Sequence, residues 1–453
     1  MKPHSAPYEI VLFLGAVVAS MTVAACAAGD GETPDEIAFT PASFACEQDI
    51  GITLPDGFCG VVFADNLGRA RHIAVNDNGD VYVATQAPRR RRGEDAPPPP
   101  PPIRALRDSD GDGKADVEED FGDQPGGTGM GIHGGFLYFS TPTAVYRYAL
   151  GGGLVPAGEA EPVIEGFAEQ GQHYSKPFSF DEAGHIYVTV GAPSNACQEE
   201  ARTPGSPGVN PCPQLDEHAG IWRFDAAASG QTPADGERYA TGIRNAMALD
   251  WNHETDRLYA LQHGRDSLAT LWPDDYDDAI SAELPAEEMM IVEEGADFGW
   301  PYCYWDQLQD KRVLAPEYGG DGAEVGRCAE FGEPIVAFPG HWAPNDLVFY
   351  EGEQFPARYR GGAFVAFHGS WNRSPLPQEG YRVSFVPMRD GMPAGEYETF
   401  ADGFAGPPPI EMGNVTARPT GLAVGPDGSL FIVDGQRGKV WRIVYAPSSE
   451  AER

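Results

Sequence analysis

Three residues of this chain have the chemistry to remove a proton and to stabilise the negative charge that follows: His173, Arg244 and Asn245. His173 lies in the polar stretch 171–177, where an imidazole can act as a general base near neutral pH, although a lone loop histidine is more often a surface residue. Arg244 and Asn245 precede an apolar stretch and offer a charged fork and an amide to carboxylate or enolate oxygens. A surface arginine next to a turn asparagine is the alternative, so the context must decide.

Two further polar segments follow apolar stretches and add a candidate cation site and more arginines. In the segment 261–266, Gly264 permits a turn that can expose backbone carbonyls to a cation, although an ordinary hairpin exit has the same composition. Arg373 ends the polar segment 367–373, and Arg418 begins the turn before the last apolar repeat. Solvated arginines beside a packed tryptophan are the alternative for these two.

A calcium-like loop runs from Asp108 to Glu119. Gly113 occupies position 6 of the twelve-residue pattern, where a sharp turn is needed. The residues at the ligand positions are Asp108, Asp110, Asp112, Lys114 (the position of a backbone carbonyl), Asp116 and Glu119. Because the flanking sequence is not helical, we expect a structural Ca²⁺ loop away from the reaction centre, with an unoccupied acidic turn as the alternative.

The elements that must position these residues are six copies of a β-hairpin. Each copy is an apolar strand, a turn rich in Asp, Asn or Gly, and a second apolar strand. The copies cover residues 73–85, 129–141, 178–190, 247–261, 347–367 and 422–434. Since one hairpin cannot bury both of its faces, the repetition predicts an all-β fold, a six-bladed β-propeller. We interpret the longest interval, from Tyr259 to Phe364, as an enlarged connection and not as a seventh blade.

Four motifs on successive hairpins carry a family resemblance. They are TGIRNAMALDW, QHG followed by GADFGWPYC, AFHGSWNR with GYRV, and RPTGLAVGPDGSLFIVD. In this order they resemble the pyrroloquinoline quinone (PQQ)-dependent soluble glucose, sorbosone and pyranose dehydrogenases, from roughly Gly57 to Tyr445. The resemblance implies a six-bladed propeller with PQQ and Ca²⁺ in a polar site at one end. It also implies oxidation of a sugar or a related alcohol or aldehyde by hydride transfer to PQQ.

The resemblance assigns roles to the candidate residues. It implies that His173 is the general base, that Arg244 stabilises charge on the reduced quinone and that Asn245 contacts the cofactor. The backbone carbonyls of Gly264 and Arg265 would hold the Ca²⁺ of the cofactor. The arginines that would pair with the carboxylates of PQQ are Arg373 and Arg418, with Arg71 as a weaker match.

The chain departs from the family pattern at the calcium turn, where Arg265 stands in place of the usual proline. Two other function classes therefore stay open. A Ca²⁺-dependent propeller lactonase or hydrolase would gather side-chain carboxylates, not arginines, around one metal. A non-catalytic lipoprotein that binds carbohydrate or a partner protein would lack an aligned His173 and Arg244. With no C-x-x-C-H haem motif in the sequence, a dehydrogenase would pass its electrons to an external acceptor.

The N-terminal sequence predicts export. An apolar stretch over residues 10–23 is too short to span a bilayer reliably and is followed by two alanines and Cys26, as in the lipobox of bacterial lipoproteins. We expect a signal peptide over 1–25, a lipidated Cys26, a tether over 26–40, a propeller domain over 41–447 and a tail over 448–453. The expected location is the periplasm or cell surface, with membrane attachment by the lipid anchor only. An ordinary signal peptide is the alternative.

Six cysteines remain after Cys26, and an even number in an oxidising compartment indicates three disulfides. Proximity in the sequence favours the pairs Cys46–Cys59, Cys197–Cys212 and Cys303–Cys328, with metal ligation as the alternative. The formal net charge of −37 argues against nucleic acid and anionic lipid surfaces as partners. Residues 89–102 hold runs of arginine and proline that cannot form a core strand, so we expect an exposed insertion there.

Overall fold

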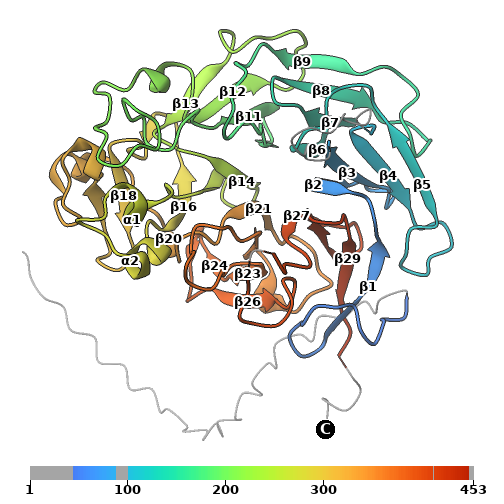
Figure 1. Ribbon diagram of the computed structural model, residues 1–453. Coiled ribbons are helices and arrows are strands. Elements are labelled where there is room, and N and C mark those ends of the chain that lie inside the picture. Colours follow the sequence, from blue (N-terminus) through green and yellow to red (C-terminus); the bar gives the residue numbers. More distant parts are fainter. Residues whose placement is uncertain (1–43, 88–99, 412, 448–453) are drawn as a thin grey trace, which may run out of the picture. The chain divides into compact units, whose positions relative to one another are not determined.

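Six β-sheets are arranged in a ring in the computed structural model of the protein, which describes residues 44–87, 100–411 and 413–447 (Figure 1). Each sheet contains four antiparallel strands, and the third sheet carries one additional short strand. The fold is a six-bladed β-propeller, as the sequence predicts.

The blades follow one another along the chain. Blade 1 contains β2 (Arg69–Val75), β3 (Val81–Gln86), β4 (Ile103–Arg107) and β5 (Val117–Phe121). Blade 2 contains β6 (Met130–His133), β7 (Phe136–Ser140), β8 (Ala144–Ala149) and β9 (Glu161–Glu165). Blade 3 contains β10 (Phe178–Phe180), β11 (His185–Val190), β12 (Gly220–Asp225), β13 (Glu237–Thr241) and β17 (Ala296–Asp297). Blade 4 contains β14 (Ala246–Asn252), β15 (Arg257–Gln262), β16 (Glu287–Val292) and β20 (Val336–Phe338). Blade 5 contains β21 (Pro344–Phe349), β22 (Ala363–Phe367), β23 (Arg382–Val386) and β26 (Glu398–Ala401). Blade 6 contains β27 (Pro419–Val424), β28 (Leu430–Asp434), β29 (Val440–Tyr445) and β1 (Phe58–Ala64).

Each predicted hairpin supplies the first two strands of one blade. The second strands β3, β22 and β28 are buried along their whole length, because a neighbouring blade covers each face of the sheet. Phe364 of β22, for example, shares one apolar cluster with Ile432 of β28 and Trp441 of β29. The apolar hairpins therefore become blades by packing against each other around the ring.

The ring closes through the two ends of the propeller domain. Strand β1 pairs with β29 in antiparallel register, from Phe58 opposite Tyr445 to Ala64 opposite Val440. A disulfide between Cys46 and Cys59 ties the segment before β1 to β1 itself. Blade 6 is thus assembled from strands at opposite ends of the sequence.

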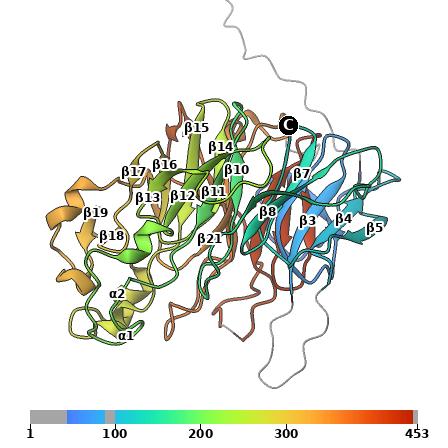
Figure 2. The ribbon, with the colours of Figure 1, turned by 90° about the horizontal axis from the view of Figure 1, so that it is seen from above.

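The other connections hold the remaining short elements. Two short helices, α1 (Leu268–Leu271) and α2 (Asp278–Glu283), lie between β15 and β16 of blade 4. A hairpin of β18 (Cys303–Asp306) with β19 (Lys311–Leu314) lies between β17 and β20. Figures 1 and 2 both place these three elements together on one side of the ring. A second small hairpin pairs β24 (Met388–Arg389) with β25 (Met392–Pro393), and the 3-10 helices are η1 (Pro213–Asp216), η2 (Pro316–Tyr318), η3 (Gly326–Glu330) and η4 (Ala357–Tyr359). The interval from Tyr259 to Phe364 is therefore an enlarged connection, as predicted.

All three predicted disulfides are present. Their Cα–Cα distances are 5.8 Å for Cys46–Cys59, 6.2 Å for Cys197–Cys212 and 5.9 Å for Cys303–Cys328, within the range of such bonds. The predicted signal peptide, Cys26, the tether, most of the 89–102 insertion and the tail lie outside the described residues. None of the helices in the described part of the chain is long and apolar enough to cross a membrane.

The turns between the first and second strands of the blades surround an acidic cavity of about 930 Å³. Its carboxylates belong to Asp181, Glu182, Asp250, Asp346, Glu351, Glu353 and Asp427. Among the described residues that line it there is no lysine or arginine. We call this end of the ring the acidic end.

Candidate functional site

The candidate residues gather at the end of the ring opposite the acidic end. In each blade the first strand begins beside the point where the second strand ends, as the pairs Ala246–Gln262, Pro344–Phe367 and Pro419–Asp434 show. Residues just before a first strand and just after a second strand therefore meet. We call this end of the ring the site end.

His173 lies in the loop between β9 and β10, with its backbone in the left-handed region at φ 49°. Its Nδ1 atom is 2.6 Å from the carbonyl oxygen of Ala192, which follows β11. Because a carbonyl oxygen can only accept, Nδ1 must carry the proton, and Nε2 is left as the basic atom. The contact thus fixes the tautomer that a general base requires.

The charge state of His173 is set by its surroundings. Burial, together with the nearby positive charge of Arg244, lowers the pKa of His173 to about 3. The ring is therefore neutral, and able to accept a proton, throughout the physiological pH range.

Gly191 brings His173 close to Asn245. A Cβ atom at Gly191 would lie 2.7 Å from the carbonyl oxygen of His173 and 3.1 Å from Oδ1 of Asn245. Only glycine fits this close approach. The amide nitrogen of Asn245 lies 3.4 Å from Nδ1 of His263, whose Nε2 atom is 2.7 Å from the carbonyl oxygen of Pro344.

Arg244 precedes β14 and is almost completely buried, with 3% of its surface exposed. Its Nε and Nη2 atoms donate to the carbonyl and side-chain oxygens of Asn195 at 3.1 and 2.9 Å. Its Nη1 atom donates to the carbonyl of Gly264 at 2.9 Å and, weakly, to that of His263 at 3.5 Å. A last bond of 3.0 Å joins Nη2 to Asp266. The donors of Arg244 are thus engaged within the chain, and its positive charge is what it could offer a ligand.

Asp266 connects the loops around Arg244 and was not among the predicted site residues. Its carboxylate accepts hydrogen bonds from Arg202 at 2.6 Å, from Arg244 and from the amide of Asn372. Burial would raise the pKa of Asp266, but the charges of Arg244 and Arg202 outweigh it and hold the pKa below its usual range. Asn195 also contacts Asp266, so four residues from different parts of the sequence meet there. No local sequence pattern could identify this group of residues.

A basic cavity of about 300 Å³ opens at the site end between blades 1, 5 and 6. The described residues that line it include no carboxylate; they are Arg69, Arg71, His368, Arg418, Thr420, Gly435 and Gln436. Arg71 donates to Oδ1 of Asn345 at 2.7 Å, and Arg418 lies 5.3 Å from the ring centre of Tyr381. The rings of His263 and His368 lie 6.3 Å apart, which links this cavity to the neighbourhood of Asn245. The structure thus brings Arg71 and Arg418 together, as the cofactor prediction requires.

Arg373 does not line this cavity. Its guanidinium donates to the carbonyls of Ala282 at 2.7 Å and Gly340 at 3.4 Å, and pairs with Glu283 at 2.7 Å. These contacts occupy the donors that a cofactor carboxylate would need. The predicted cofactor role of Arg373 is therefore not favoured by its contacts.

The predicted calcium turn is already held by protein groups. The N–H of Gly264 donates to Glu287 at 3.1 Å, while its carbonyl accepts from Arg244. The side chain of Arg265 points elsewhere and pairs with the buried Glu317. Because the guanidinium of Arg244 opposes a second cation beside it, this arrangement does not fit Ca²⁺ at the Gly264 carbonyl, and we derive no step through that ion.

The predicted calcium loop lies far from the site end in sequence and topology, between β4 and β5. Ligand atoms of Asp108, Asp110 and Asp112 lie within 4.8 Å of one another. Asp116 instead accepts from the N–H of Ser109 at 2.7 Å, and Glu119 is an exposed residue of β5. The strand after the loop excludes an EF-hand, and Ca²⁺ binding there stays a prediction.

Comparison with known proteins places this geometry in context. A family model described as TrAA12-like matches residues 52–446. The holo form of a pyranose dehydrogenase PQQ domain from Coprinopsis cinerea has a TM-score of 0.69 at 18% identity, covering 87% of this chain and 97% of that one. A calcium structure of a Trichoderma reesei carbohydrate-active enzyme of family AA12 has a TM-score of 0.69 at 17% identity, with the same coverage. The PQQ-bound aldose sugar dehydrogenase of Streptomyces coelicolor has a TM-score of 0.51 at 16% identity, covering 86% and 99%.

One curated relative also matches in part. A protein of Borreliella burgdorferi described as uncharacterized is 29% identical over 212 residues, which are 46% of this chain. The match spans 49% of that protein's length. The structural matches share the fold of this chain at low identity.

Proposed function

Because this chain belongs to the TrAA12-like family, we propose that it is a quinoprotein oxidoreductase that oxidises a sugar or a sugar-derived alcohol or aldehyde with PQQ. One observation carries the proposal: a neutral, oriented His173, a buried Arg244 and a basic cavity lined by arginines share the site end. The PQQ-containing pyranose and aldose sugar dehydrogenases with the same fold support it.

The basic cavity fits the chemistry of PQQ, which carries three carboxylates. Arg71 and Arg418 would hold these carboxylates, and Arg69 lines the same cavity. When bound, PQQ supplies the hydride acceptor of the reaction. The residues of the chain would then bind and orient the cofactor and the sugar, and they would neutralise charge.

His173 performs the proton transfer in this proposal. The reacting hydroxyl of the sugar would lose its proton to Nε2 of His173 as its carbon is oxidised to a carbonyl, with bound PQQ as the hydride acceptor. The carbonyl of Ala192 keeps the imidazole in the required tautomer and stabilises the imidazolium that results. The positive charge of Arg244 offsets the negative charge that develops on the acceptor.

We further propose that the protein is exported, anchored through Cys26, and passes its electrons to an external acceptor. The lipobox-like sequence before Cys26 and the three disulfides support export. The absence of a haem motif from the sequence supports an external acceptor.

A hydrolase with a central metal has less support. Among the described residues, Asp108, Asp110 and Asp112 form the one group of at least three close potential metal ligands, and they lie on an outer turn of blade 1. The charged side chains among the described residues that line the basic cavity are arginines. A non-catalytic lipoprotein is disfavoured because His173 and Arg244 lie on either side of the same segment after β11.

A titration of the purified protein with PQQ tests the proposal. We expect saturable binding of PQQ and, with an artificial electron acceptor, oxidation of at least one aldose. Absence of both binding and turnover would overturn the assignment. Parallel titrations with Ca²⁺ and with EDTA decide the ion: binding that requires Ca²⁺ would mean that Arg244 releases Gly264 when the cofactor enters.

A further inference from the structure

The segment 191–197, which follows β11, contacts both predicted catalytic residues. The carbonyl of Ala192 faces Nδ1 of His173 at 2.6 Å, and its N–H donates to the carbonyl of Arg244 at 2.7 Å. Three residues later, Asn195 binds the guanidinium of Arg244. One short segment thus sets the position of the base relative to the charge.

Asn195 is the centre of this arrangement and is only 2% exposed. Its side-chain oxygen accepts from Arg244 at 2.9 Å and from the N–H of Asp266 at 2.8 Å. Its side-chain nitrogen donates to the carbonyl of Asp266 at 3.0 Å. Its own carbonyl accepts from Arg244 at 3.1 Å and from the indole of Trp300 at 3.0 Å. Each polar atom of its amide side chain therefore has a partner in the site.

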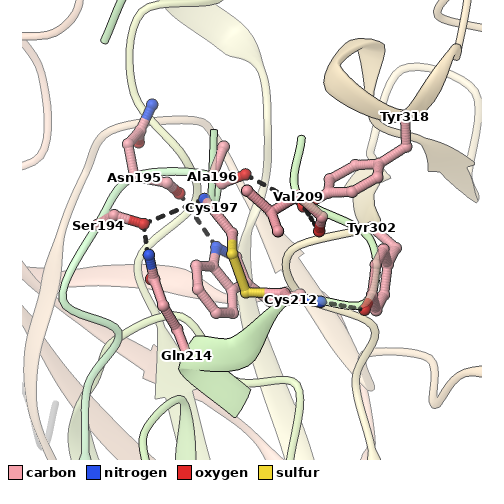
Figure 3. The surroundings of a disulfide bond; sticks show 10 residues. Ser194, Asn195, Ala196, Cys197, Val209, Cys212, Gln214, Tyr302 and Tyr318 are labelled. Atoms are coloured by element: carbon pink, nitrogen blue, oxygen red, sulfur yellow. Dashed lines mark hydrogen bonds between the residues drawn. A yellow bond between two sulfur atoms is a disulfide. The ribbon is translucent and has the colours of Figure 1, made fainter. Parts of the chain in front are cut away.

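The segment is also anchored through Ser194 and Cys197, as Figure 3 shows. The disulfide joins Cys197 to Cys212, whose N–H donates to the hydroxyl of Tyr302 at 3.0 Å. Ser194 donates to Gln214 at 2.7 Å and accepts from the N–H of Cys197 at 3.1 Å. None of these anchoring contacts involves Arg244, so Ser194 supports the segment whereas Asn195 contacts the site.

We propose that Asn195 is a positioning residue, which holds the Arg244 guanidinium and the Asp266 backbone in fixed register with His173. The kinetic consequence of this proposal rests on the proposed dehydrogenase function. The hydrogen bonds of Asn195 are present without the cofactor. Without the side-chain amide of Asn195, Arg244 keeps Asp266, the Gly264 carbonyl and the backbone carbonyl of Asn195 as partners, and it loses the bond from Nη2 to Oδ1 of Asn195.

The test compares three variants. Asn195→Ala removes the side-chain bonds to Arg244 and Asp266. Asn195→Asp keeps the oxygen acceptors but lacks the nitrogen donor, so it is the conservative replacement. Ser194→Ala is the matched control, since it alters the same buried segment without touching Arg244.

Two readouts separate this inference from the proposed function. In the protein without cofactor, exchange with water of the Arg244 Nη2–H that donates to Oδ1 of Asn195, followed by ¹⁵N NMR, should accelerate at least about 10-fold in Asn195→Ala and stay near wild type in Ser194→Ala. In the PQQ-loaded protein, kcat should fall roughly 10- to 100-fold in Asn195→Ala with the KM for sugar nearly unchanged. Asn195→Asp should restore most of the exchange protection.

Unchanged exchange in both Asn195 variants would overturn the proposal, as would an equal loss of kcat in Ser194→Ala. Failure of the wild-type protein to bind PQQ would overturn the proposed function, and the exchange measurement would still decide the role of Asn195. If Asn195→Ala does not fold, Asn195→Leu, which keeps the side-chain volume but has no polar atom, provides the same comparison with Ser194→Ala.

Discussion

At the scale of single residues, the structure explains how His173 is prepared for proton transfer. Its left-handed backbone turns the ring toward the Ala192 carbonyl, and non-glycine residues in this region are strained. The amide nitrogen of Gln170 donates to the carbonyls of Gln172, His173 and Gly191 and holds the strained turn closed. Strain of this kind persists where the surrounding structure determines the conformation.

We expect His173→Gln to lower kcat by about 10²- to 10⁴-fold, because glutamine keeps polarity at this position but cannot accept the proton. PQQ binding should remain. Steady-state kinetics and a PQQ titration check both parts. His253→Gln, which alters a half-exposed histidine at the acidic end, is the control and should retain full activity. Wild-type turnover in His173→Gln would mean that another group is the base.

The pH dependence follows from the lowered pKa of His173, about 3. Since the base works in its neutral form, activity is lost only as the pH falls through that pKa. We therefore expect the acid limb of kcat/KM to lie well below pH 6. A limb with its midpoint near the ordinary histidine value of about 6.5 would contradict the assignment.

The types and order of the site residues could be predicted from the sequence, whereas their supports could not. His173, Arg244 and Arg418 occupy recognisable motifs next to strands, so their placement at one end followed from the hairpin pattern. Asn195 and Asp266 lie 71 residues apart, and their bonds arise only when the loops of two blades meet. The pairing of Arg373 with Glu283 likewise depends on a contact between distant loops.

At the scale of elements, Arg373 joins the loop after β22 to the end of α2. Its side chain is 5% exposed, and it reaches the carbonyls of Ala282 and Gly340 as well as Glu283. A buried guanidinium with such partners stabilises the loop that carries Asn372, and through it Asp266. The contact therefore supports the site from outside the cavity.

We expect Arg373→Met to lower the free energy of unfolding by about 3 kcal/mol, because it leaves Glu283 and two buried carbonyls without their donor. Binding of PQQ by the folded protein should change little. Urea unfolding and a PQQ titration provide the measurements. Arg358→Met is the control: its side chain is 57% exposed, so its pair with Glu398 should be worth less than about 1 kcal/mol. A selective loss of PQQ affinity in Arg373→Met would instead support the predicted role of Arg373 in binding the cofactor.

At the scale of the whole molecule, the pairing of β1 with β29 closes the ring. The four main strands of each of five blades come in sequence order, with β17 added to blade 3 from the connection after β16, and blade 6 alone needs both ends of the domain. The fold class followed directly from six hairpins, since each hairpin became the inner half of a blade. The closing strand has no hairpin partner next to it in the sequence, so the pattern did not reveal it.

A chain that begins at residue 65 should therefore lose its cooperative unfolding transition and associate, because β29 becomes an exposed edge. A chain that begins at residue 44 keeps β1 and the Cys46–Cys59 disulfide and should remain monodisperse. Thermal unfolding and size-exclusion chromatography distinguish the two. A shortened chain that melts like the longer one would show that ring closure contributes little to stability.

The acidic cavity and the basic cavity occupy opposite ends of the same ring, so the charge of the described lining changes sign along the ring axis. A particle whose two ends differ in charge does not meet a charged surface in random orientation. An anode would attract the acidic end and leave the end that holds His173 turned toward solution. For a protein immobilised on an electrode, the sign of the electrode charge would thus set the orientation. A positive electrode would leave the site end open to the sugar, and a negative electrode would bring the site end close to the conductor.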